Sequence, residues 1–145
     1  EILKTQRQRI HNPDRLRQFD FISRAMTADT LKLDSLFQSL LQAENRRIEP
    51  WAATTLSYLN HSTRKDYAVK YIRPALEELT EVQRTGDIFF PRNWVGALLR
   101  NHDSEAAYKA VETFLSVYPD YPPLLKNKIL QAAYPLYRKY ADKKK

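Results

Sequence analysis

Hydrophobic residues recur at spacings of three and four along almost the whole chain, which is the period of an α-helix and not that of a β-strand. The first predicted helix follows Asn12, a favoured N-cap, and Pro13, a favoured first helical residue. Its apolar stripe consists of Leu16, Phe19, Ile22 and Met26. We therefore expect one amphipathic helix that ends at about residue 26.

Two further helices are predicted before residue 62. One begins near Asp29 and stops before the polar stretch at 44–47. Its expected buried face is Leu33, Leu36, Phe37, Leu40 and Leu41. Pro50 opens a shorter helix that ends at residues 60–61. The inward positions of that helix are Trp51, Thr55, Leu56 and Leu59.

The next two predicted helices are separated by a proline. Ser62 is the expected N-cap of a helix whose apolar positions are Tyr67, Val69, Tyr71 and Ile72. Pro74 lies inside this pattern, so it either kinks the helix or starts a new one. From Ala75 the stripe resumes, with the helix predicted to end at Gly86 as a left-handed C-cap.

Three segments complete the pattern. Residues 87–90 are expected to form a linker whose two Phe side chains, Phe89 and Phe90, fill the core. A helix then starts at Pro91, and Asp103 or Ser104 caps the following one. Their expected apolar positions are Trp94, Val95, Leu98, Leu99, Ala107, Tyr108, Val111, Phe114 and Leu115.

Three prolines within residues 119–123 interrupt the chain, and the last helix is predicted from about Leu124 to Tyr140, with a kink at Pro135. Seven or eight helices with short connections describe an all-α fold of antiparallel neighbours. Helix pairs recur at roughly 35–45 residues, which favours a right-handed α-α superhelix of the HEAT/armadillo kind, a helical solenoid, over a closed bundle. We expect residues 1–145 to form a single helical domain.

Composition narrows the function classes. The chain has 145 residues, 43% of them hydrophobic, which is enough for one buried core. It has no cysteine, so disulfides and thiolate chemistry are excluded, and its two glycines cannot form a glycine-rich phosphate loop. No apolar run approaches the length of a membrane span, so no membrane partner is expected. Because residue 1 is Glu, we expect a piece of a longer chain.

The formal net charge of +7 lies at the two ends of the chain. Residues 1–24 have a net charge of +3 and residues 138–145 a net charge of +4, so residues 25–137 are neutral overall. A nucleic-acid-binding protein needs its basic residues gathered on one folded face. We therefore expect solvated ends and no nucleic-acid partner.

No catalytic, cofactor-binding or metal-binding residue is predicted in this chain. The three histidines, His11, His61 and His102, lack the spacing of a zinc motif and lie at helix boundaries, where a histidine caps carbonyls or faces water. Ser62 and Ser104 lie near histidines but are better explained as N-caps than as nucleophiles. The remaining candidates are carboxylates expected on a solvated face and tyrosines expected in the core: Glu77, Glu78, Glu81, Tyr108, Tyr134 and Tyr137.

Three segments carry a resemblance to a known family. They are AENRRIEPWAATTLSYLNH at 43–61, RTGDIFFPRNW at 84–94 and PDYPPLLKNKILQAAYPLYR at 119–138. With them, residues 12–138 resemble the C-terminal helical region of bacterial zinc aminopeptidases of the aminopeptidase N type, a family related to leukotriene A-4 hydrolase. The chain contains neither the H-E-x-x-H zinc motif nor the G-x-M-E-N peptide-binding motif of that family.

The resemblance implies a larger parent enzyme that removes N-terminal residues from peptides and binds zinc in another domain. This chain would then be a non-catalytic cover over the active-site cleft, with the catalytic domain and peptide substrates as partners and no cofactor of its own. The alternative is an autonomous helical-repeat scaffold that binds protein segments. Localisation stays open between a bacterial periplasm and the cytoplasm. We also expect self-association of the fragment through Ile2, Leu3 and Ile10.

Overall fold

The computed structural model describes residues 1–141 and contains only helices and their connections within that range. The α-helices are α1 (Ile2–Gln8), α2 (Pro13–Ile22), α3 (Thr30–Leu40), α4 (Glu49–Leu59), α5 (Lys65–Glu77), α6 (Leu79–Thr85), α7 (Phe90–Leu99), α8 (Glu105–Val117), α9 (Pro123–Ala132) and α10 (Tyr134–Tyr140). Three short 3₁₀ turns lie at Ser23–Ala25, Ala43–Arg46 and Ser62–Arg64. The prediction of an all-α fold is confirmed.

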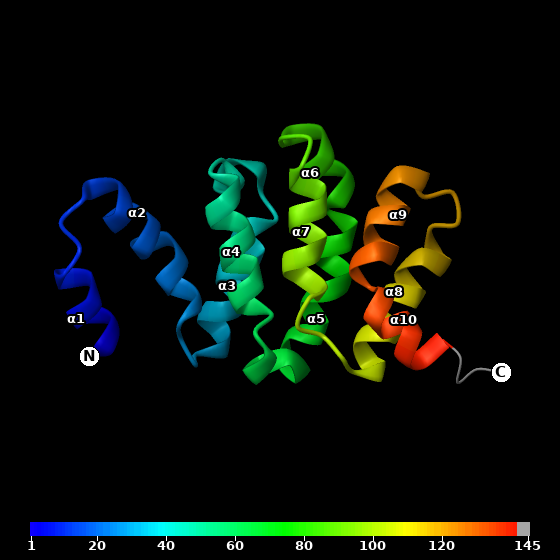
Figure 1. Ribbon diagram of the computed structural model, residues 1–145, viewed down its shortest axis with the longest axis horizontal. Coiled ribbons are helices and arrows are strands. Elements are labelled where there is room, and N and C mark those ends of the chain that lie inside the picture. The colour runs from blue at the N-terminus through cyan, green and yellow to red at the C-terminus, as the bar shows by residue number, and fades with distance from the viewer. Residues whose placement is uncertain (142–145) are drawn as a thin grey trace.

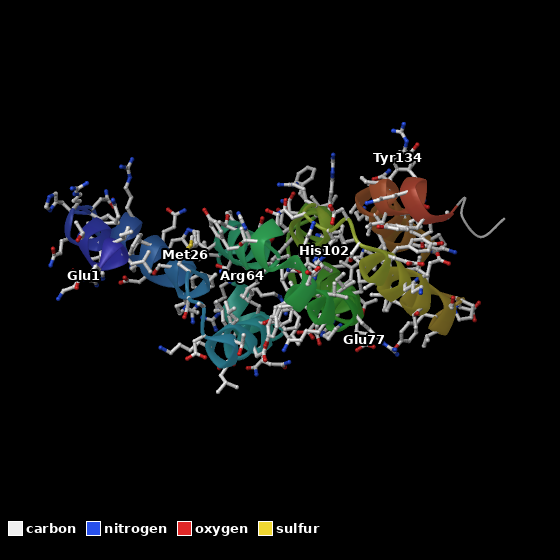
Figure 2. All side chains as sticks on the ribbon, turned by 90° about the horizontal axis from the view of Figure 1, so that it is seen from below. Glu1, Met26, Arg64, Glu77, His102 and Tyr134 are labelled. Carbon is white, nitrogen blue, oxygen red and sulfur yellow. The ribbon has the colours of Figure 1, made fainter. Side chains whose placement is uncertain are left out.

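The helices stand side by side in a row, with the chain running up one helix and down the next (Figure 1). Helices α4, α7 and α9 form one layer, and α3, α5 and α8 form the other. Contacts join α4 to α7 and α7 to α9 within the first layer, and α5 to α8 within the second. Seen from below, with the row running across the view, Tyr134 and Glu77 lie on opposite sides of the molecule (Figure 2). In residues 1–141 no helix has the length and apolarity that a membrane span requires.

Helix α7 occupies the centre of this arrangement, since it contacts α4, α5, α6 and α9. Its buried residues are Phe90, Pro91, Trp94, Val95, Ala97, Leu98 and Leu99. The Trp94 ring is fully buried, and its Nε1–H donates to the Ala75 carbonyl over 3.0 Å. Burial of one large indole with its only donor satisfied anchors α7 to α5 in the other layer.

Asn12 is an N-cap as predicted, Ser104 is the one of the two predicted alternatives that caps α8, and Asp29, near which a helix was predicted to begin, caps α3. Asn12, Asp29 and Ser104 each accept hydrogen bonds from backbone N–H groups in the first turn that follows. The prediction for Ser62 is wrong, because His61 accepts from the Thr63 N–H through its ring and caps a 3₁₀ turn instead. The α-helix therefore begins three residues later, at Lys65.

The helix count differs from the predicted seven or eight, since residues 1–141 contain ten α-helices. Helix α1 was not predicted, because Ile2 and Leu3 alone define no stripe. Helix α5 continues through Pro74 and ends at Glu77, since buried residues precede and follow the proline: Tyr71, Ile72, Ala75 and Leu76. The final helix is divided at Ala133, two residues before Pro135.

Gly86 is not a left-handed cap. Its φ of −111° and ψ of 179° are extended backbone that any residue adopts. A Cβ built there would lie 2.8 Å from the Val82 carbonyl oxygen and 2.9 Å from Cδ2 of Phe90. Glycine is required at this position by the close approach of Phe90, and not by backbone conformation.

Three side chains expected in the core lie outside it. Phe90 is buried as predicted, whereas Phe89, the N-cap residue of α7, is 68% exposed. Tyr134 is 62% exposed, and Met26 is also exposed beyond the end of α2. The expected basic tail at 138–145 is described only to residue 141, so half of it lies outside the described residues.

Candidate interaction surface

No metal or nucleophilic centre is assembled in the part of the chain that the structure describes. No group of three or more His, Cys, Asp or Glu residues within 1–141 is placed to hold a metal ion. His11 is exposed and His61 caps the turn at 62–64. Ser104 caps α8, as predicted, and Ser62 lies exposed next to His61.

His102 differs from its prediction, since it is buried and only 3% exposed. Its Nε2 lies 2.8 Å from Oδ1 of Asn60, and Nδ2 of Asn60 donates to the Leu56 carbonyl, which fixes the orientation of that amide. Nε2 is therefore the donor, and Nδ1 is left buried without a hydrogen-bond partner among the described residues. Burial lowers the pKa of His102, because the protonated ring would carry a charge away from water and its Nδ1–H would have no hydrogen-bond acceptor.

Glu78 and Glu81, two of the three carboxylates expected on a solvated face, lie near the buried guanidinium of Arg46. Arg46 is buried, donates to the Leu40 carbonyl and lies 3.5 Å from Oε1 of Glu81. Burial and the neighbouring Glu81 raise the pKa of Glu78, whose Oε2 has no hydrogen-bond partner. This cluster joins the turn after α3 to α6, so its role is structural.

A second polar cluster, absent from the sequence predictions, joins α3 to α5. Oδ1 of Asp34 accepts from the Tyr71 hydroxyl over 2.6 Å, and Oδ2 lies 2.8 Å from both Nζ of Lys70 and the Tyr67 hydroxyl. These donors, with Lys70 first, lower the pKa of Asp34. Both oxygens of the carboxylate accept hydrogen bonds from residues of α5, so the cluster holds α3 and α5 together.

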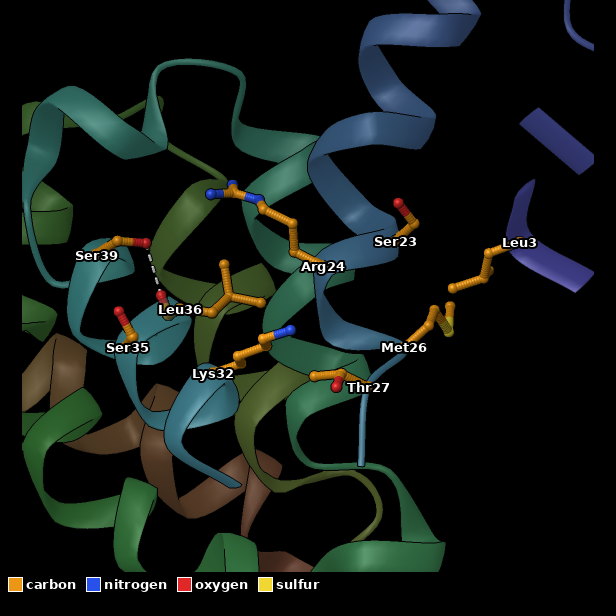
Figure 3. Close-up of a pocket in the computed structure, with 9 residues that line it drawn as sticks. All are labelled: Leu3, Ser23, Arg24, Met26, Thr27, Lys32, Ser35, Leu36 and Ser39. Atoms are coloured by element: carbon orange, nitrogen blue, oxygen red, sulfur yellow. Dashed lines mark hydrogen bonds between the residues drawn. The ribbon is translucent and has the colours of Figure 1, made fainter. Parts of the chain in front are cut away.

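A cavity of about 550 Å³ lies between the end of α2 and α3 (Figure 3). It is lined by Leu3, Ser23, Arg24, Met26, Thr27, Lys32, Ser35, Leu36 and Ser39. Several of its polar groups already have partners: Arg24 donates to the Phe21 carbonyl and lies over the Phe21 ring, and Oγ of Ser39 donates to the Leu36 carbonyl. Oγ1 of Thr27 also accepts from the Asp29 N–H, so three of the six polar side chains that line the cavity are engaged within the fold.

The layer made by α4, α7 and α9 has two adjoining cavities on its surface, of about 670 Å³ and 390 Å³. Both are lined by Asn93 and Arg100, so the two cavities adjoin along the exposed face of α7. We call the two cavities together the cationic groove. Its other lining residues are Phe89, Arg92, Val95, Gly96, Lys128, Gln131 and Ala132 on the α7–α9 side, and Ala53, Thr54, Ser57, Tyr58 and Ala97 on the α4–α7 side.

The cationic groove has three cations, Arg92, Arg100 and Lys128, and no carboxylate among its lining residues. None of the three forms an ion pair with a carboxylate of residues 1–141, which is also true of other surface cations such as Lys4, Lys32 and Lys126, so the distinctive feature of the groove is that its lining includes no carboxylate. The prediction for α7 rested on its apolar stripe and did not include the polar stripe on the opposite face. Arg92, Gly96 and Arg100, spaced four apart, were its signal.

The family-like segment at 84–94 forms the end of α6, the connection to α7 and the first half of α7. Its apolar residues divide between two environments. Phe90 and Trp94 are buried, whereas Ile88 is 79% exposed and Phe89 is 68% exposed. Helices α4, α7 and α9 all begin at this edge of the row (Figure 1), where Ile48 and Leu124 are exposed as well.

No known protein family matches this sequence, and neither a characterised protein nor a solved structure shows significant similarity to it.

Proposed function

We propose that this chain is the non-catalytic C-terminal helical domain of a zinc metallo-aminopeptidase of the aminopeptidase N type. In this proposal its helix pairs wind as a right-handed HEAT/armadillo-like superhelix. The domain covers the active-site cleft of the parent enzyme and limits which peptides enter it. Zinc is bound by residues outside this chain, because residues 1–141 offer no suitable group of ligands.

One observation carries the proposal. The segment that most resembles the family, at 84–94, places Ile88 and Phe89 in solvent at an edge where neither helps the fold. Exposed large apolar side chains next to one another are typical of surfaces that another domain covers. Ile48 and Leu124 extend this apolar edge along the starts of α4 and α9. The catalytic domain of the same polypeptide is the proposed cover.

The first test is the complete reading frame that encodes this chain. The proposal requires an H-E-x-x-H segment several hundred residues upstream, and a frame without one contradicts it. An autonomous scaffold that binds protein segments is the function that would then remain, because the fold is shared and the context differs.

The second test uses the full-length enzyme. Ile88→Asp/Phe89→Asp should loosen the cover and change the ratio of kcat/KM for long and short peptides. Leu31→Asp is the matched control, because Leu31 is equally exposed on α3, in the other layer. An equal ratio in both variants and the unchanged enzyme would show that this edge does not face the cleft.

A further inference from the structure

We infer that the cationic groove binds an extended acidic segment of a polypeptide. The inference depends on this face alone and holds whether or not the chain belongs to a peptidase. Arg92 and Arg100 project from α7, and Lys128 projects from α9, without a carboxylate partner within residues 1–141. Unpaired cations of one sign along a depression attract and orient a ligand of the opposite sign.

The dimensions of the groove suit an extended chain. Neighbouring packed helices lie about 8–10 Å apart, so a path across α4, α7 and α9 is about 20 Å long. An extended polypeptide rises about 3.3 Å per residue, so about six residues fit along this path. Side chains of such a segment point alternately toward and away from the surface, so acidic residues at alternate positions would all face the cations.

Gly96 gives an independent indication that a ligand approaches α7 closely. Glycine inside a helix costs about 1 kcal/mol relative to alanine. A Cβ built at Gly96 would meet only Nη2 of Arg100, at 3.6 Å, which is ordinary contact, so the fold has room for alanine here. With Ala97 and Ala132 beside it, Gly96 keeps the floor of the groove low, as close approach of another backbone requires.

The neutral polar groups of the groove favour a polypeptide over a nucleic acid. Asn93 and Gln131 present amides that both donate and accept hydrogen bonds, and Ser57 presents a hydroxyl. A peptide backbone offers donors and acceptors in alternation, whereas a phosphodiester backbone only accepts. The acceptor oxygens of the two amides therefore match a peptide and have no partner on a phosphate.

Fluorescence anisotropy tests the inference with a labelled octapeptide of alternating Glu and Ser, at low ionic strength and with the 145-residue chain. The matched probe has Gln in place of Glu. We expect the Glu probe to bind and the Gln probe to bind at least about tenfold more weakly. The groove variant Arg92→Gln/Arg100→Gln/Lys128→Gln should bind the Glu probe about tenfold more weakly than the unchanged chain.

A control variant of equal charge separates the groove from general attraction. Lys4→Gln/Arg9→Gln/Arg84→Gln removes three exposed cations outside the groove and should change the affinity less than twofold. Gly96→Ala should weaken binding while leaving the thermal midpoint unchanged or higher, which a purely structural role for Gly96 would not produce.

Four outcomes would overturn the inference. One is equal loss of binding in the groove and control variants, and another is equal binding of the Glu probe to the Gly96→Ala and unchanged chains. The third is competition by single-stranded oligothymidine that is as strong as competition by unlabelled Glu peptide, which would indicate a general polyanion surface. Absence of binding by the unchanged chain at low ionic strength contradicts the inference directly.

Discussion

Helices α2 and α7 are each ten residues long and each start with a proline in the first turn, yet their surroundings are opposite. Helix α2 has no buried residue, whereas seven residues of α7 are buried. Helix α7 has neighbours on several sides, but α2 packs mainly on α4 and the short turn that follows it. Burial in this row is therefore set by the number of neighbouring helices and not by the quality of the helix itself.

Surface polar contacts replace burial at the N-terminal end. Arg7 forms a two-pronged ion pair with Asp20, which joins α1 to α2 across exposed side chains. The aromatic contact between Phe21 and Trp51, with ring centroids 5.8 Å apart, joins α2 to α4. Exposed ion pairs contribute little to stability, so this end should open at a lower free energy than the centre of the row.

The largest expected difference follows from truncating one aromatic residue in each helix. Trp94→Ala should lower the free energy of unfolding by about 3–5 kcal/mol, because it leaves a cavity and an unpaired Ala75 carbonyl. Phe19→Ala in α2 removes a partly exposed ring and should cost about 1 kcal/mol. Urea denaturation followed by circular dichroism measures both, and equal losses would contradict the contrast between the helices.

The two glycines of the packed region should respond in opposite ways to substitution by alanine. Gly86→Ala should destabilise by about 1–3 kcal/mol, since the new Cβ overlaps the Val82 carbonyl and Phe90. Gly96→Ala should stabilise by up to about 1 kcal/mol, because helix propensity rises and the space is free. Thermal midpoints of the two variants should move in opposite directions, and a shift of the same sign would refute this account.

Acidification should weaken the packed region through His102. Its pKa is lowered by burial, so its contribution to stability is complete above the pKa of about 6.5 expected in the unfolded chain. That contribution decreases as the pH falls from about 6.5 toward the folded pKa. The thermal midpoint should therefore fall between pH 7.5 and 5.5, and this fall should be smaller in His102→Gln.

Two charged groups near His102 also affect its pKa. Asp103 favours its protonation and Lys65 opposes it, while these two residues form an ion pair with each other. The pKa of Asp103 is lowered by the hydrogen bond from Lys65, so its stabilisation is lost only below the usual carboxyl pKa of about 3.9. The thermal midpoint of His102→Gln could instead fall as steeply between pH 7.5 and 5.5 as that of the unchanged chain. That result would show that His102 does not cause the pH dependence.

The smallest expected effect is weak self-association through the N-terminal end. Ile2 is 78% exposed, and Leu3 borders an apolar cavity of about 430 Å³ with Ile10, Phe19 and Tyr58. Sedimentation equilibrium should detect association at high concentration, and Ile2→Glu/Leu3→Glu should abolish it. Ile88→Glu/Phe89→Glu is the control at the start of α7, and association lost in both variants would show that the contact is not specific to the N-terminal end.

The sequence predicted the helices of this protein better than its polar interactions. Apolar spacing located α3, α4, α7 and α8, because each has a continuous buried stripe, such as Leu33 to Leu40 in α3. Helix breaks were less predictable. Pro74 continues a helix, because core packing on both sides of it outweighs one lost hydrogen bond.

Pairings across the fold could not be read from spacing at all. Asp34 meets Tyr71 from 37 positions away, and His102 meets Asn60 from 42 positions away. The cationic groove combines three helices, so its lining depends on how α4, α7 and α9 are rotated about their axes. Only the α7 portion, with Arg92, Gly96 and Arg100 in helical register, was visible in the sequence.

The two tryptophans allow fluorescence to compare the N-terminal end of the row with its centre. Trp94 is sealed in the centre beside Phe90 and the guanidinium of Arg46, whereas Trp51 is partly exposed and touches Phe21 of α2. Indole emission shifts to longer wavelength when water reaches the ring. Trp94→Phe leaves Trp51 as the single tryptophan, whose emission should report the separation of α2 from α4. Trp51→Phe leaves Trp94, whose emission should report unfolding of the centre of the row.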